Sequence, residues 1–257
     1  MPKQTVQPPT HPLTELLRRE ISQSVSQSEG ETERRGLERV FGVLGPQGVG
    51  KTYAIEALRQ ELLGGQFLEK SAYIGDVVAG DNGRLRQLLS NLLSKELDLL
   101  IIDEVLTKDK ETIEQEIEKA KNRIQTVIFI GLIDPKEGTD VENLTQQLPN
   151  ITAPQRRLLI LDPPLLQNQL GKQYKELLTQ LNQAGFDVQE VSFTPTFIQD
   201  LLRYFYTKGK FKVDIEDPRV QQKIDELTQQ AVDGEMNLRD LLWQFEDSLW
   251  ELQDEED

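Results

Sequence analysis

A short glycine-rich segment, residues 45–52, has the composition and spacing of a phosphate-binding loop, G-x-x-x-x-G-K-T. Glycines at these positions let the backbone curl until its N–H groups point at phosphate oxygens. Lys51 is expected to reach the β- and γ-phosphates, and Thr52 to offer its hydroxyl to Mg²⁺. The pattern therefore predicts a site for a nucleoside triphosphate and Mg²⁺. The residues expected to contact the nucleotide are Gly45, Pro46, Gln47, Gly48, Val49, Gly50, Lys51, Thr52 and the following Tyr53.

A pair of carboxylates, Asp103 and Glu104, ends the apolar run at residues 97–102. Phosphoryl transfer relies on positioning and charge stabilisation, so a second acidic element at a strand end is expected beside a phosphate loop. Asp103 would bind Mg²⁺ through water, and Glu104 would polarise the water that attacks the γ-phosphate. An acidic helix start after a core strand would give the same pair without chemistry. Beside the loop, the pair favours hydrolysis over binding alone.

The elements that position these residues follow from the hydrophobic pattern. Residues 40–44 form an apolar run before the loop, and residues 53–63 have helical periodicity after it, so the loop closes onto a helix N-terminus whose dipole favours an anion. Alternating strand and helix signals predict a three-layer α/β P-loop core with a parallel sheet of five strands. The strands are expected at residues 37–44, 71–74, 97–102, 126–133 and 158–161.

After Pro163 and Pro164 the sequence has few strand patterns, and its hydrophobic periodicity predicts helices. We expect a small all-helical lid there, with one helix at residues 165–184 and others near 196–206, 218–232 and 237–252. The sequence thus divides into an N-terminal helix and polar linker (1–36), a P-loop core (37–164), a helical lid (165–253) and an acidic tail (254–257).

The composition limits the function classes. The 257 residues contain 37% apolar side chains, enough for an ordinary core, and no cysteine, which excludes disulfides and thiolate chemistry. The formal net charge of −15 opposes loose electrostatic attachment to nucleic acid or anionic lipid. No apolar run approaches the length that spans a bilayer, and residues 1–12 lack the pattern of a secretory signal. We therefore expect a cytoplasmic protein with no membrane partner.

The loop, the acidic pair and the helical C-terminal region together resemble the AAA+ ATPases over residues 40–252. In this resemblance residues 45–52 correspond to the Walker A loop and residues 99–104 to the Walker B strand. It implies ATP as the nucleotide, Mg²⁺ as the metal, and assembly into a homo-oligomer. Asp134, which ends the strand expected at 126–133, is similar in position to the sensor-1 residue, where Asn, Ser or Thr is more usual.

Three arginines acquire roles only through this resemblance. Arg156, with Arg157 as second choice, resembles the arginine finger that reaches into the nucleotide site of a neighbouring subunit. Arg239, early in the last helix, resembles the sensor-2 arginine that faces the γ-phosphate. Surface arginines that flank a strand, or an exposed helix arginine paired with Asp240, are the simpler interpretations.

Two further features receive no catalytic assignment. His11, the only histidine, stands beside Pro12 without other metal-ligand residues, so we assign it no role. The aromatic residues of segment 193–211 are interspersed with basic ones, as on a nucleic-acid surface. Because most of these aromatic residues are at helical spacing, a lid core is the simpler interpretation.

The leading hypothesis is an ATPase that clamps ATP between core and lid and changes shape on hydrolysis. Three alternatives stay open: a slow nucleotide switch or scaffold of the signalling ATPase type, a DNA-associated ATPase, and a small-molecule P-loop kinase. The net negative charge opposes binding to nucleic acid. The carboxylate pair favours water as the phosphoryl acceptor, which makes a kinase less favoured. The sequence does not identify the protein on which an ATPase would act.

Overall fold

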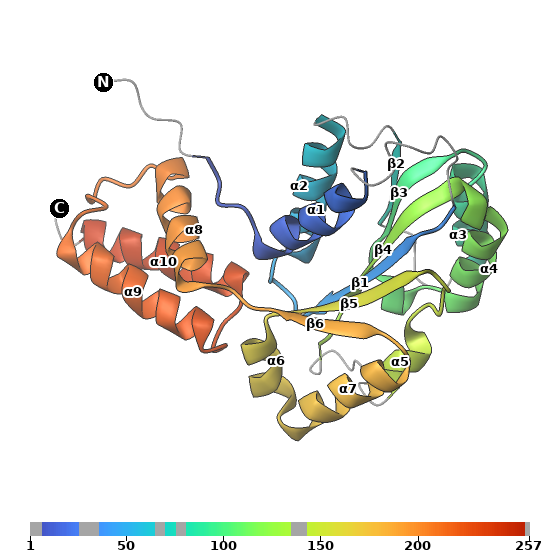
Figure 1. The fold of residues 1–257 in the computed structure, drawn as a ribbon. Helices are drawn as coiled ribbons and strands as arrows, with labels where there is room; N and C mark the ends of the chain where they lie inside the picture. The colour runs from blue at the N-terminus through green and yellow to red at the C-terminus, as the bar shows by residue number, and fades with distance from the viewer. Residues whose placement is uncertain (1–6, 26–35, 65–69, 76–80, 135–142, 255–257) are drawn as a thin grey trace.

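A computed structural model gives the fold and describes residues 7–25, 36–64, 70–75, 81–134 and 143–254 (Figure 1). Parts of the expected polar linker (26–35) and of the expected acidic tail (255–257) lie outside these residues. No helix in the described ranges is both long enough and apolar enough to cross a lipid bilayer.

The centre of the molecule is a six-stranded parallel sheet with the strand order β2-β3-β4-β1-β5-β6. Strand β1 lies between β4 and β5, and its apolar run is buried along its whole length. The strands are β1 (Arg39–Gly45), β2 (Ser71–Ile74), β3 (Leu97–Ile102), β4 (Ile124–Leu132), β5 (Gln155–Leu161) and β6 (Asp187–Val191).

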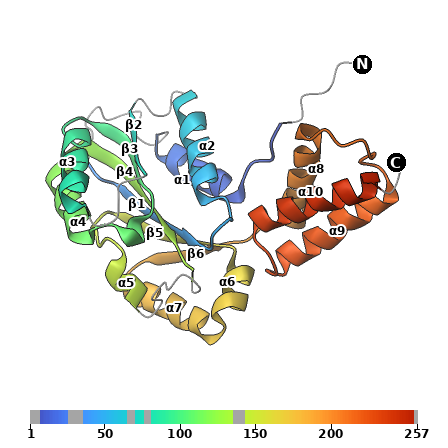
Figure 2. The ribbon, with the colours of Figure 1, turned by 180° about the vertical axis from the view of Figure 1, so that it is seen from behind.

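Helices cover both faces of this sheet, as a parallel sheet with apolar side chains on both faces requires (Figures 1 and 2). On β1, Phe41 and Val43 point to the layer of α1 (Pro12–Val25) and α2 (Lys51–Gly64), whereas Val40 and Leu44 point to the opposite layer. That second layer contains α3 (Asn82–Leu92), α4 (Lys110–Ala120), α5 (Leu144–Gln147), α6 (Pro163–Leu170) and α7 (Lys172–Gln183).

Three helices form the lid beyond one end of the sheet: α8 (Pro195–Lys208), α9 (Pro218–Val232) and α10 (Leu238–Asp254) (Figure 1). Two of them begin at a capping side chain followed by proline, which fixes their first turn: Thr194 caps α8 and Asp217 caps α9. The apolar faces of the three helices join the core cluster that α1 and α2 build on the sheet. The lid therefore shares one continuous core with that layer.

The structure differs from the sequence expectation in the region after Pro164. The sheet has six strands rather than five, because β6 pairs in parallel with β5. The helix expected at 165–184 is broken at Gly171, which adopts a positive φ of 56° between α6 and α7. Both helices and β6 pack with the α/β layers, so the purely helical segment begins at Pro195.

Candidate nucleotide-binding site

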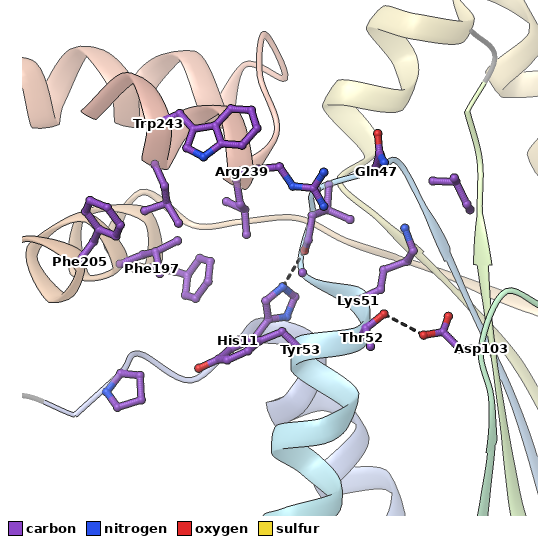
Figure 3. A pocket seen from close by; sticks show the side chains of 18 of the residues that line it. His11, Gln47, Lys51, Thr52, Tyr53, Asp103, Phe197, Phe205, Arg239 and Trp243 are labelled. Atoms are coloured by element: carbon purple, nitrogen blue, oxygen red, sulfur yellow. Dashed lines mark hydrogen bonds between the residues drawn. The ribbon is translucent and has the colours of Figure 1, made fainter. Parts of the chain in front are cut away.

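A cleft of about 1270 Å³ lies between the carboxyl end of the sheet and the lid (Figure 3). Ligands of open parallel sheets bind outside the carboxyl ends of the strands, and here the phosphate loop leaves β1 at that edge. The core contributes the loop, Asp103 and Glu104 to the cleft, and the lid contributes α8 and α10. Of the residues in the cleft wall, those used below are His11, Gln47, Gly48, Val49, Gly50, Lys51, Thr52, Tyr53, Asp103, Glu104, Phe197, Phe205, Arg239, Leu242 and Trp243.

The loop has the conformation that its glycines permit. Gly48 and Gly50 have φ values of 77° and 78°, a region that other residues rarely adopt. The Lys51 ammonium folds back over the loop and donates to the carbonyls of Gly45 (2.8 Å) and Pro46 (2.6 Å). Burial lowers the pKa of Lys51 to about 8, while nearby Asp103 opposes that shift.

The Asp103 carboxylate is held by three donors. Its Oδ2 accepts from Thr52 Oγ1 (2.9 Å) and from the Tyr73 hydroxyl (2.7 Å), and its Oδ1 accepts from the Glu104 N–H (2.8 Å). A side chain on Gly75 would lie 2.7 Å from the Tyr73 ring, so this glycine leaves room for the ring to lie as it does. Tyr73 was not predicted as a site residue, since nothing in the sequence of β2 marks it.

The chemistry of this donor set fits magnesium. Mg²⁺ prefers oxygen ligands and is usually held by one or two protein groups together with phosphates and water. The Thr52 hydroxyl and the Asp103 carboxylate, already within hydrogen-bond distance of each other, provide two such oxygens beside the loop.

Glu104 leaves β3 in an unusual backbone conformation. Its φ of 51° and ψ of 39° lie in the left-handed region, which non-glycine residues seldom adopt. The side chain is 61% exposed, lines the cleft, and lies 3.7 Å from the ammonium of buried Lys108. Such strain is typically found at functional sites. The turn presents one carboxylate to the cleft while its neighbour Asp103 stays buried.

The lid touches the phosphate loop directly. The Arg239 backbone N–H donates to the Gly48 carbonyl at 3.2 Å. A side chain on Gly48 would lie 2.5 Å from Asn237 Oδ1 and would have to adopt a φ of 77°, so glycine favours this approach. Figure 3 shows the exposed Arg239 side chain reaching from α10 toward the loop. The sequence-predicted Arg239 and loop residues therefore share one cleft.

His11 also contacts the loop, although the sequence analysis assigned it no role. Its Nε2 lies 3.1 Å from the Val49 carbonyl, and its Nδ1 accepts from the Leu13 N–H at 3.1 Å. The ring is 3% exposed and lies edge-on to Phe193 and Phe197. The sequence holds no signal for this contact, because it depends on a packing of residues 38 positions apart.

The remaining predicted residues lie away from the cleft. Of the described residues at the end of β4, Gly131 and Leu132 line it and Asp134 does not. Arg156 pairs with Val40 near the amino end of β1, at the end of the sheet opposite the cleft. Val40 is five residues before Gly45, so Arg156 lies about 16 Å from the loop.

The two adjacent arginines differ in their partners. The Arg157 guanidinium bonds to Glu20 (2.9 Å) and Asp187 (3.0 Å). Arg156 stacks at 4.4 Å over the Phe186 ring, and its Nε and Nη2 have no hydrogen-bond partner among the described residues. Burial lowers the pKa of Arg156.

Comparison with known proteins finds one matching family. Residues 41–168 match AAA, the ATPase family associated with various cellular activities. No curated protein sequence matches the chain.

The solved structures that are similar to this chain include the following two. Domain III of the replication initiation protein DnaA from Thermotoga maritima is 12% identical, with a TM-score of 0.46 over 92% of this chain and 82% of that one. A DNA replication initiation factor is 13% identical, with a TM-score of 0.47 over 91% of this chain and 60% of that one.

Proposed function

Because the chain belongs to the AAA+ family of ATPases, we propose that it binds MgATP in the cleft between sheet and lid and hydrolyses it. The observation that carries this proposal is the convergence of one set of groups on one cleft. The loop, the Thr52–Asp103 pair, the carboxylate of Glu104 and the arginine of the lid all line it.

The loop is the phosphate-binding part of the proposed site. Lys51 now donates to two loop carbonyls, and phosphate oxygens would replace these acceptors. Thr52 and Asp103 would hold Mg²⁺, which when bound neutralises charge on the β- and γ-phosphates. The N-terminus of α2 adds its dipole to the attraction for the anion.

Glu104 is the group proposed to activate water. It is the carboxylate that the left-handed turn leaves 61% exposed beside the cleft, whereas Asp103 is buried, accepts three hydrogen bonds and is the proposed Mg²⁺ ligand. As a general base it would accept a proton from the attacking water at an oxygen of its carboxylate.

The nucleobase would lie against the apolar wall of the cleft. Tyr53 from α2 and Phe197, Phe205 and Leu242 from the lid line this wall. Arg239 stands between the wall and the loop (Figure 3), where its positive charge can approach the γ-phosphate. ATP would therefore contact core and lid together, and hydrolysis would alter the lid contact, which is the proposed conformational change.

We further propose that neighbouring copies assemble with Arg156 serving the nucleotide site of the next copy. Arg156 lies away from the cleft of its own chain, and its buried Nε and Nη2 have no hydrogen-bond partner among the described residues. Arg157, by contrast, pairs with Glu20 and Asp187. In that case ATP turnover per chain rises with protein concentration, and Arg156→Ala binds ATP but turns it over slowly. Wild-type turnover in that variant would remove this part of the proposal.

A binding titration with MgATP tests the site itself. Lys51→Ala should lose binding, while Glu104→Gln should bind about as tightly as the wild type because it removes only the proposed base. Lys119→Ala, an exposed lysine on α4 outside the cleft, is the matched control and should bind normally. Equal affinity in Lys51→Ala and Lys119→Ala would show that the cleft is not the phosphate site.

A further inference from the structure

We propose that His11 is a positioning residue of the phosphate loop, which orients one peptide N–H toward the phosphates. The inference rests on the proposed ATP function and concerns the segment just before α1. The relevant bond is the one from His11 Nε2 to the Val49 carbonyl, at 3.1 Å (Figure 3).

The direction of a carbonyl sets the direction of the next N–H. In a planar trans peptide the C=O and the N–H point to opposite sides of the bond. The Val49 carbonyl points to the His11 ring, so the N–H of Gly50 points away from that ring. In a phosphate loop these N–H groups are the ligands of the phosphate oxygens.

A second carbonyl of the loop is held in the same way. The Arg239 N–H of the lid donates to the Gly48 carbonyl, which directs the N–H of Val49. The carbonyls of two successive residues are thus hydrogen-bonded to groups outside the loop. Arg239 of the lid bonds to Gly48, and His11 of the N-terminal segment bonds to Val49.

The glycines of the loop make its peptides free to rotate unless hydrogen bonds hold them. Gly48 and Gly50 flank Val49 and both have positive φ, and glycine visits alternative conformations at little cost. A free peptide between two glycines can therefore rotate and turn its carbonyl toward the phosphates, where it would repel them. A hydrogen bond to the carbonyl disfavours that rotation.

The groups around His11 favour the neutral tautomer of its ring that carries the proton on Nε2. The Leu13 N–H donates to Nδ1, so Nδ1 carries no proton and Nε2 is the donor to Val49. Burial lowers the pKa of His11 to about 4, which keeps the ring neutral in this tautomer near pH 7. Phe193 and Phe197 pack edge-on against the ring, and Phe197 belongs to α8. His11 therefore joins loop and lid helix.

Two substitutions separate the two hydrogen bonds of His11. The amide of His11→Asn lies near the position of Nδ1 and can still accept from Leu13, but it does not reach Val49. The amide of His11→Gln extends about as far as Nε2 and can still donate to the Val49 carbonyl. If His11 orients the loop, Asn should weaken binding and Gln should largely preserve it.

The readout is the affinity for ATP compared with that for adenosine, which lacks phosphates. We expect His11→Asn to bind ATP about tenfold more weakly, the scale of one hydrogen bond, with adenosine binding unchanged. His11→Phe, which keeps the ring contacts but has no nitrogen, should show the same selective loss and serves if the Asn variant does not fold. Thr14→Val is the control, since it removes only the bond from Thr14 Oγ1 to the Ala54 carbonyl (2.8 Å) and should leave both affinities unchanged.

Three results would overturn the role of His11. They are unchanged ATP affinity in both the Asn and Phe variants, equal losses for ATP and adenosine, and a Thr14→Val variant that loses ATP selectively. Failure of the wild type to bind ATP at all would instead contradict the proposed function, so the two failures are distinguishable.

Discussion

Individual side chains around Asp103 show how the site is held before any ligand binds. Thr52, Tyr73 and the Glu104 N–H all donate to this one carboxylate. Because Thr52 is expected to turn to Mg²⁺, its bond to Asp103 is exchanged when the metal binds. The Tyr73 bond need not change, so it is the contact that keeps the carboxylate oriented through the cycle.

Removal of the Tyr73 hydroxyl should therefore raise the requirement for magnesium. We expect Tyr73→Phe to need several-fold more Mg²⁺ for half-maximal ATP turnover, with ATP binding in the absence of metal unchanged. The measurement is a Mg²⁺ titration of turnover at saturating ATP. Tyr206→Phe is a matched control, because it loses a comparable bond, to the Val213 carbonyl (2.7 Å), in the lid. A normal magnesium curve for Tyr73→Phe would contradict the assignment.

Asp162 is a second buried carboxylate, at the end of β5, with a left-handed φ of 53°. Its Oδ1 accepts from the Leu165 N–H at 3.4 Å, and its Oδ2 has no partner among the described residues. Burial raises the pKa of Asp162 from 3.8 to about 7. The native state therefore binds a proton that the unfolded state releases between these values, so the carboxyl destabilises the fold increasingly as pH rises from about 4 to 7.

Asp162→Asn should remove this penalty, since asparagine keeps the Oδ1 acceptor and tolerates the left-handed conformation. The gain in unfolding free energy over the wild type should grow by about 3 kcal/mol between pH 5 and pH 8, at roughly 1.4 kcal/mol per pH unit up to the native pKa. Urea denaturation at the two pH values measures it. If the variant exceeds the wild type in unfolding free energy by the same amount at pH 5 and pH 8, the Asp162 carboxyl does not titrate as stated.

Among the elements, the turn between α9 and α10 fixes the lid against α6. Asn168 Nδ2 donates to the carbonyls of Asp233 and Gly234, each at 3.0 Å. A side chain on Gly234 would lie 2.3 Å from the Pro164 carbonyl carbon, and the residue has a φ of 72°. Backbone lies against backbone here, which leaves no flexible group to move aside.

Gly234→Ala should therefore shift α10 and with it Arg239. We expect a loss of at least about 3 kcal/mol of stability, well above the roughly 1 kcal/mol of left-handed strain alone, together with slower ATP turnover. Gly185→Ala provides the control, because Gly185 has a φ of 81° and open space where a side chain would be. Similar melting temperatures for the two variants would contradict the tight contact.

The sequence predicted those helices and strands whose positions follow from local hydrophobic and proline patterns. The strands with continuous apolar runs, β1, β3 and β4, lie where expected, and so do the helices after the phosphate loop and after Pro195 and Pro218. Strand β6 was missed because it is short, polar and at the sheet edge, with Val191 as its one buried residue. Its valines at 188 and 191 after Gly185 were the available signal.

The parts of the site that the sequence did not reveal depend on contacts between distant segments. Tyr73 reaches Asp103 across 30 positions, and His11 reaches Val49 across 38. Neither residue belongs to a motif. Only the pairing of β2 with β3 brings Tyr73 to Asp103, and only the packing of α1 beside α2 brings His11 to the phosphate loop. The loop and the acidic pair were recognisable because their chemistry lies within a few consecutive residues.

Across the whole molecule, the lid and the α1–α2 layer share one apolar cluster, and the cleft opens between them. A ligand that touches both sides can therefore change how the lid sits. The chain has two tryptophans to report such a change. Trp243 is 60% exposed and lines the cleft, while Trp250 packs edge-on against Phe211 at 5.3 Å.

MgATP should consequently change the tryptophan emission through Trp243, because the nucleotide alters the exposure of that side chain. We expect a saturable change in the wild type and in Trp250→Phe, and none in Trp243→Phe. A titration followed by fluorescence measures it. An identical change in Trp243→Phe would place the response elsewhere in the molecule.

The release of inorganic phosphate from MgATP, compared between the wild type and Glu104→Gln, tests the central claim most directly. The account predicts steady release by the wild type and a loss of at least about a hundredfold in the variant, the scale of a lost general base, while the variant still binds ATP. Equal release by the two proteins, or none by a wild type that binds ATP, would contradict it.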